Sequence, residues 1–462
     1  MTRIRLLAPL FAVCLASSGI CAASASALSV NWMKGYAEPN TPAKYNKVGV
    51  IKVGPRNAKN VLVLEPGTSA GGGYFVPLAK WVVAKTPGWQ VWSVERRENL
   101  IEDQSELNKA KAGRATGRQL FDYYLGYLEN SQVKRHFKLL DNHRVGFAKQ
   151  WGMTVAVQDL HAVIGAARKL GGKVALGGHS LGGSVVTAYA TWNFGGKPGA
   201  DDLGGLVYID GSGRPPESSD AARAALTTLN SDNASPWLSF GGIPSPFAGL
   251  YNATGSEGVL IDPNSPSLGQ TFAALPAALK PKVRVTNLAE YGFALNVGTS
   301  PPSLIAAQAH LGRGVSPHGR IHGWDGRGAL TPITRYATMF AGAGIKNVDG
   351  TEWYFPTRLT DDTGGVGSGL RNPAQQILGL RSTLGDQLPR RLLIYAFGAA
   401  LGGAGVLAET RLLAQQSHIP SANLVLIDRH RTYAHNDPAG AFPHNVFFAH
   451  LVPFLNRVSA AR

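Results

Sequence analysis

Short apolar runs alternate with stretches of helical spacing at both ends of this chain. The runs at residues 61–64, 174–176 and 206–209 contain almost no polar alternation, which is typical of strands buried on both faces. We therefore expect a mostly parallel sheet with helices on both faces. The remaining expected strands are 47–53, 90–94, 392–396 and 424–427, and the expected helices are 74–84, 154–170, 184–192, 406–416 and 445–457.

Residues 211–390 interrupt this alternation. They are rich in Pro, Gly, Ser and Ala and show no regular succession of strands and helices. This block predicts a large cap inserted between two strands of a core made of residues 28–210 and 391–462. Two aromatic clusters in it, around Trp237 and Trp353, indicate either a small core of the insertion or an apolar surface over the site.

The first 27 residues have the pattern of an export signal. Arg3 and Arg5 precede an apolar run that is too short to span a membrane, and residues 25–27 form a small-x-small cleavage pattern. The alternative is a buried N-terminal helix. Cys14 and Cys21 both lie in this segment, so a processed chain would have no cysteine and would depend on packing for stability. We expect a secreted protein, extracellular or in the cell envelope.

The chain carries a formal net charge of +16. Such a charge attracts anionic partners, and association with an anionic cell-envelope surface is one interpretation, with simple solubility as the other. The basic residues are scattered and are not interleaved with aromatic residues, so we expect no nucleic-acid partner. The sequence does not indicate an oligomeric state.

The strongest chemical signal is the segment Gly178-His179-Ser180-Leu181-Gly182. It lies between a predicted strand and a predicted helix, where a tight turn can present a serine hydroxyl. Glycines two positions before and after the serine let such a turn close against neighbouring chain, and the helix N-terminus favours nearby negative charge. We predict that Ser180 is a nucleophile; a merely structural Gly-rich turn is the alternative.

Together with Gly183, this segment resembles the nucleophile elbow of the α/β-hydrolase superfamily, which includes esterases and lipases. The resemblance covers about 28–210 and 391–462, without the insertion, and implies an α/β-hydrolase fold. It also implies a late histidine base between the last strand and the last helix, where His435 stands. The competing histidines are His430, His444 and His450.

The acid of the predicted triad departs from the usual pattern. The turn where the superfamily commonly carries it, residues 397–403, has no carboxylate, and Glu409 lies well inside a predicted helix. Some members place the acid one strand earlier, at the position of Asp210. A carboxylate there could bond the far nitrogen of His435, although Asp210 could instead cap a turn.

The resemblance also implies an oxyanion hole of two backbone N–H groups. One is that of Leu181, and the other is that of Thr68, because Pro66-Gly67-Thr68 resembles the His-Gly-x turn of the superfamily. The glycines at 71–73 could instead cradle a phosphate, but they lack the Lys-Ser/Thr ending of a phosphate loop.

We therefore expect a secreted, lipase-like serine esterase that acts on small-molecule or lipid esters and needs no cofactor. His318, His322 and Asp325 have spacings that a metal site could use, but no element supports one, and we expect no metal. A peptidase or amidase on the same fold, and a binding protein with a degenerate triad, are the alternatives.

Overall fold

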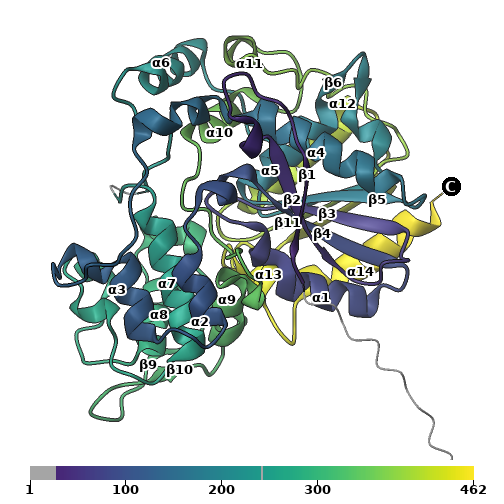
Figure 1. Ribbon diagram of the computed structural model, residues 1–462. Helices are drawn as coiled ribbons and strands as arrows, with labels where there is room; N and C mark the ends of the chain where they lie inside the picture. The colour runs from purple at the N-terminus through teal and green to yellow at the C-terminus, as the bar shows by residue number, and fades with distance from the viewer. Residues whose placement is uncertain (1–27, 241–242, 462) are drawn as a thin grey trace, which may run out of the picture.

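The computed structural model describes residues 28–240 and 243–461 and is built around one eight-stranded sheet (Figure 1). The strand order is β1-β2-β4-β3-β5-β8-β11-β12. Strand β2 runs antiparallel to β1 and β4, and all the other neighbouring pairs are parallel. The strands are β1 (Val30–Lys34), β2 (Lys47–Val53), β3 (Asn60–Glu65), β4 (Trp89–Glu95), β5 (Val174–His179), β8 (Gly205–Ile209), β11 (Leu393–Gly398) and β12 (Leu424–Asp428).

Alternate residues of the central strands enter two separate cores. In β3, Leu62 and Leu64 point into one core and Val61 and Val63 into the other, which follows from the two-residue period of a strand. Helices α1 (Val76–Lys85) and α14 (Val446–Ala460) cover the first face. Helices α4 (Met153–Arg168), α5 (Leu181–Thr191) and α12 (Gly403–Gln416) cover the second. The expected sheet, covered on both faces, is confirmed.

The segment between β8 and β11 adds no strand to the main sheet. Figure 1 shows its helices in two groups beside the sheet. One group contains α7 (Phe247–Ile261), α8 (Asn287–Leu295), α9 (Ile333–Phe340) and the hairpin of β9 (Gly314–Val315) and β10 (Trp324–Asp325). The other contains α6 (Ser219–Asn230), α10 (Thr357–Asp362) and α11 (Pro373–Leu378).

Residues before the insertion also join the first of these groups. Helices α2 (Ser105–Lys111) and α3 (Gly117–Tyr124) pack against α7. The side chains of Trp237 and Trp353 are buried in this part of the molecule. Trp353 packs against Tyr124 and Phe137, and Trp237 packs against Trp151, so the two tryptophans belong to a core that the insertion shares with residues before it.

Three differences from the sequence prediction concern one edge strand and the starts of two helices. Strand β1 was not predicted; it is a sheet edge that pairs only with β2. The segment Gly72–Phe75 is a 3₁₀ turn that leads into α1. Helix α5 begins at Leu181, immediately after Ser180 and not at residue 184, because its glycines are needed for close packing despite their low helix propensity.

Within the described ranges, no helix combines the length and the apolar character needed to cross a bilayer. The expected export signal, residues 1–27 with Cys14 and Cys21, lies outside the described residues.

Candidate active site

Ser180 stands on a strained turn between β5 and α5. Its backbone has φ 56° and ψ −128°, a region that non-glycine residues rarely adopt and that is common at functional sites. A Cβ at Gly178 would lie 2.2 Å from the carbonyl oxygen of Gly182, and a Cβ at Gly182 would lie 2.4 Å from that of Glu65. The predicted need for glycine on both sides of the serine is therefore confirmed.

The Ser180 side chain is half-buried, and its hydroxyl makes no hydrogen bond to any other residue that the structure describes. It lies at the N-terminus of the eleven-residue helix α5, where the helix dipole favours negative charge. The hydroxyl is thus partly exposed and has no hydrogen-bond partner in the described part of the chain.

Asp210 and His435 form a buried pair beside this turn. Asp210 Oδ2 accepts a hydrogen bond of 2.6 Å from His435 Nδ1, and both side chains are 1% exposed or less. Asp210 directly follows β8, and the neighbouring Gly211 packs against the Ser180 backbone, where a Cβ would lie 1.9 Å from the Ser180 carbonyl oxygen. The three residues predicted for the triad are therefore gathered at the carboxyl edge of the sheet.

The turn after β11, which lacks a carboxylate, binds Asp210 through its backbone. Four N–H groups of this turn donate to the two carboxylate oxygens at 2.7–3.2 Å, those of Ala399, Leu401, Gly402 and Gly403. Burial alone would raise the pKa of Asp210, but the His435 hydrogen bond, the attraction of that ring and the Ala399 N–H outweigh it and hold the pKa below its ordinary value. An ionised Asp210 keeps the proton of His435 on Nδ1, which leaves Nε2 as an acceptor.

His179 supports the backbone of His435. Its Nε2 donates to the His435 carbonyl oxygen at 2.9 Å, and its ring lies between those of His435 and Tyr74. Burial, and next the neighbouring His435, lower the pKa of His179 to about 3, so the ring is neutral. This role is not among the predictions from the sequence, although the position directly before Ser180 could have indicated it.

The inserted segment also holds the loop that carries His435. Asn436 donates through its side chain to the carbonyl oxygens of Ala306 and Gln308, and it accepts from the Tyr74 hydroxyl. Asp437 accepts from His310 Nδ1 at 2.5 Å. Residues 306–310 therefore anchor this loop, an arrangement that no pattern in the sequence predicts.

The turn after β3 lies directly against Ser180. A Cβ at Gly67 would be 2.7 Å from Ser180 Cβ and 3.4 Å from its Oγ. The Thr68 N–H makes no hydrogen bond to another described residue, and Leu181 is the first residue of α5. Leu181 thus adjoins the serine directly, and Thr68 follows Gly67, the residue that packs against it.

The glycines at 71–73 are poorly suited to a phosphate. The Gly71 N–H already donates to the Gly350 carbonyl oxygen, and the Gly72 N–H donates to the Glu95 carboxylate at 2.8 Å. Occupied donors beside a carboxylate disfavour an anion.

A sequence model described as the alpha/beta hydrolase family matches residues 142–351, a range that includes Ser180 and Asp210. That match and the sheet order agree with the geometry above. The chain belongs to the α/β-hydrolase superfamily. The fold expected from the resemblance is therefore confirmed.

This α/β hydrolase is also similar to several solved structures at low identity. A monoglyceride lipase from Saccharomyces cerevisiae is 9% identical, with a TM-score of 0.41 and coverage of 94% of this chain and 96% of the lipase. A carboxyl esterase from Bacillus coagulans is 12% identical, with a TM-score of 0.41 and coverage of 94% and 99%. A thioesterase domain from the curacin biosynthetic pathway is 12% identical, with a TM-score of 0.39 and coverage of 93% and 99%. A search of curated proteins gives no significant match.

The histidines that compete with His435 for the role of the base lie in other surroundings. His430 pairs with Asp428 at 2.6 Å on the surface, His444 is exposed, and His450 is half-buried in α14. In the described part of the chain, no group of three or more His, Cys, Asp or Glu side chains is placed to hold a metal ion. Asp325, one of the three residues whose spacing a metal site could use, instead forms an ion pair with Arg327.

Proposed function

We propose that this α/β hydrolase cleaves carboxylic esters through an acyl-enzyme on Ser180. One observation carries the proposal: a buried hydrogen bond of 2.6 Å joins His435 to Asp210 beside the strained turn of Ser180. A histidine held in this tautomer by an ionised carboxylate is the general base that a serine nucleophile requires.

In the proposed reaction, His435 Nε2 takes the proton of Ser180 as Oγ attacks the ester carbonyl carbon. The π electron pair moves onto the carbonyl oxygen, and the N–H groups of Leu181 and Thr68 bind this oxyanion. Collapse expels the alkoxide, which takes the proton from His435, and leaves an ester on Ser180. Water then attacks this acyl-enzyme by the same steps, releasing the acid and restoring the serine. The sequence of steps requires no cofactor.

Asp210 fixes the orientation and charge of His435 throughout this cycle. Its two oxygens are held by backbone N–H groups and by His435 Nδ1, so the carboxylate does not have to rearrange when the imidazolium forms. Such preorganised groups lower the barrier because they are in place before charge develops.

For the substrate, we propose a small-molecule or lipid ester, and for the location, a secreted or envelope-associated protein. The proposed location is supported by the export pattern of residues 1–27 and by the net charge of +16, which favours an anionic surface. These proposals are separate from the chemistry at Ser180.

Turnover of nitrophenyl esters of graded chain length, compared with aminoacyl nitroanilides, tests the proposed reaction. Ser180→Ala should abolish ester turnover without changing the melting temperature. The matched control is Ser184→Ala, one turn along α5, where the buried hydroxyl donates to the Ser212 carbonyl oxygen at 2.7 Å. Ester turnover retained by Ser180→Ala would refute the nucleophile, and turnover of amides over esters would favour a peptidase.

A further inference from the structure

We propose that Arg96 is the positioning residue of the oxyanion hole. The proposal rests on the ester hydrolysis proposed above. Arg96 follows β4 directly, and β4 lies beside β3 in parallel register. Since the carboxyl ends of parallel strands meet at one edge, Arg96 comes to lie against the turn that leaves β3. This turn, residues 66–70, also contacts Ser180 through Gly67.

The guanidinium of Arg96 binds three carbonyl groups of this turn. Its Nη1 donates to the carbonyl oxygens of Gly67 at 3.2 Å and Ala70 at 3.3 Å, and its Nη2 donates to that of Pro66. Arg96 is 6% exposed, so these contacts are shielded from water. A planar fork of several N–H donors is suited to such a set of acceptors, whereas a lysine ammonium is not.

These contacts set the direction in which the Thr68 N–H group points. The peptide bond between Gly67 and Thr68 is trans, so its C=O and N–H groups point in opposite directions. Because Arg96 holds the C=O, the Thr68 N–H must point away from the guanidinium. That N–H has no other acceptor among the described residues. A carbonyl bound by a charged donor also polarises its peptide unit, which strengthens the N–H as a donor.

Arg96 is itself held in place. Its Nε donates to Glu65 at 2.8 Å and its Nη1 to Glu352 at 3.1 Å, and both acids are buried. Burial opposes the charge, but Glu65, Glu352 and Glu98 outweigh it and raise the pKa of Arg96 above its ordinary value. The guanidinium therefore stays charged. Because both buried acids contact the guanidinium directly, its charge is compensated locally, and its effect on the site acts through the turn.

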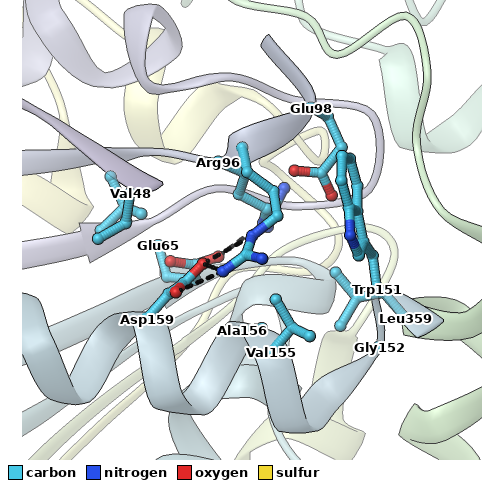
Figure 2. Close-up of a pocket in the computed structure, with 12 residues that line it drawn as sticks. Val48, Glu65, Arg96, Glu98, Trp151, Gly152, Val155, Ala156, Asp159 and Leu359 are labelled. Atoms are coloured by element: carbon cyan, nitrogen blue, oxygen red, sulfur yellow. Dashed lines mark hydrogen bonds and ion pairs between the residues drawn. The ribbon is translucent and has the colours of Figure 1, made fainter. Parts of the chain in front are cut away.

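Close packing prevents Arg96 from moving elsewhere. Figure 2 shows Arg96, Glu65 and Asp159 around one cavity, with Glu98 and Trp151 also lining it. The cavity volume is about 20 Å³, room for about one water molecule. Arg97 lines the same cavity and is equally buried, but it binds Asp159 at 2.7 Å and makes no hydrogen bond to the turn. It is therefore a matched control.

The test compares Arg96→Lys with Arg97→Lys in the full chain. For each protein, kcat and KM for a nitrophenyl ester are measured per active site, counted with a fluorophosphonate. The affinity for a trifluoromethyl ketone of the same acyl length is measured as well, because its adduct with the serine carries an oxyanion. Arg96→Lys should lower kcat about 100-fold, as loss of one oxyanion donor does, with KM within about threefold. Ketone affinity should fall by about the same factor as kcat.

Arg97→Lys should keep all three quantities within about threefold of the wild type, since it alters packing but not the turn. If Arg96→Lys behaves as Arg97→Lys does while the wild type cleaves esters, the role of Arg96 is refuted and the proposed function stands. A folded wild type that neither cleaves esters nor reacts with the fluorophosphonate refutes the proposed function itself.

Arg96→Lys could fail to fold, and Glu65→Gln then tests the same claim. The amide keeps the size of Glu65 but removes the ion pair that holds Arg96 Nε. A roughly tenfold fall in both kcat and ketone affinity, the size of one charged hydrogen bond, supports the proposal. Unchanged values for both quantities overturn it.

Discussion

Replacing Asp210 with Asn is a demanding test of the proposed triad, because the structure predicts which way the amide will turn. One carboxylate oxygen, Oδ1, accepts three backbone N–H groups, and the other, Oδ2, accepts His435 Nδ1 and one N–H. The donors to Oδ1 are Ala399, Gly402 and Gly403, and the backbone donor to Oδ2 is Leu401. An amide NH₂ cannot accept any of these bonds.

In Asp210→Asn, the oxygen of the new amide should therefore occupy the side with three donors, and its NH₂ group should face His435. An NH₂ donor there favours the ring with no proton on Nδ1, which places the proton on Nε2. In that tautomer His435 cannot take the proton of Ser180. A wrong tautomer lowers kcat by about 10⁴-fold, which corresponds to about 5 kcal/mol of transition-state stabilisation.

The assay is kcat on a nitrophenyl ester, with the melting temperature as a check that the variant is folded. The matched control is Asp428→Asn, which removes a second Asp–His pair of 2.6 Å, with His430, on the exposed surface. That control should leave kcat unchanged. If folded Asp210→Asn kept kcat within about tenfold of the wild type, where a wrong tautomer predicts a far larger loss, His435 would not depend on Asp210 and the reasoning would be wrong.

Two further predictions concern His179 and His310. His179→Phe keeps an aromatic ring but removes the hydrogen bond to the His435 carbonyl oxygen. Its kcat should fall about tenfold with little change in KM, whereas a raised KM with unchanged kcat would indicate a binding role and contradict the prediction. The hydrogen bond to Asp437 raises the pKa of His310, and burial only partly opposes it. This pair therefore stabilises the fold below the ordinary histidine pKa of about 6.5, and its contribution is lost as pH rises through the raised folded-state pKa. Between about pH 6 and 8 the wild type should lose more thermal stability than His310→Gln, and identical pH dependences of the melting temperature would contradict this.

Local patterns explain what the sequence could predict. The strands of the core appear at the expected places because apolar runs bounded by turns are local signals, as at β3 and β8. The glycines around Ser180 are also a local signal, since their lack of a side chain is required within the turn itself. Asp210 and His435 could be named from the resemblance to the α/β-hydrolase superfamily, because they stand after β8 and between β12 and α14, where members of that superfamily carry the acid and the base.

The parts that were missed depend on contacts between distant segments. Nothing in residues 399–403 indicates that their N–H groups bind a carboxylate some 190 positions earlier in the chain. The hydrogen bonds of Asn436 to residues 306–308, and those of Arg96 to the turn after β3, also join distant segments through backbone carbonyl groups. Hydrogen bonds to backbone groups leave no side-chain pattern, so only the folded structure reveals them.

The most direct test of the central claim is to find which atom reacts. The folded wild type should be treated with a fluorophosphonate, digested, and mapped by mass spectrometry. One adduct per chain on the hydroxyl of Ser180, absent from Ser180→Ala and retained in Ser184→Ala, is the predicted result. An adduct on a different residue, or none on the folded protein, would contradict the assignment of Ser180 as the nucleophile.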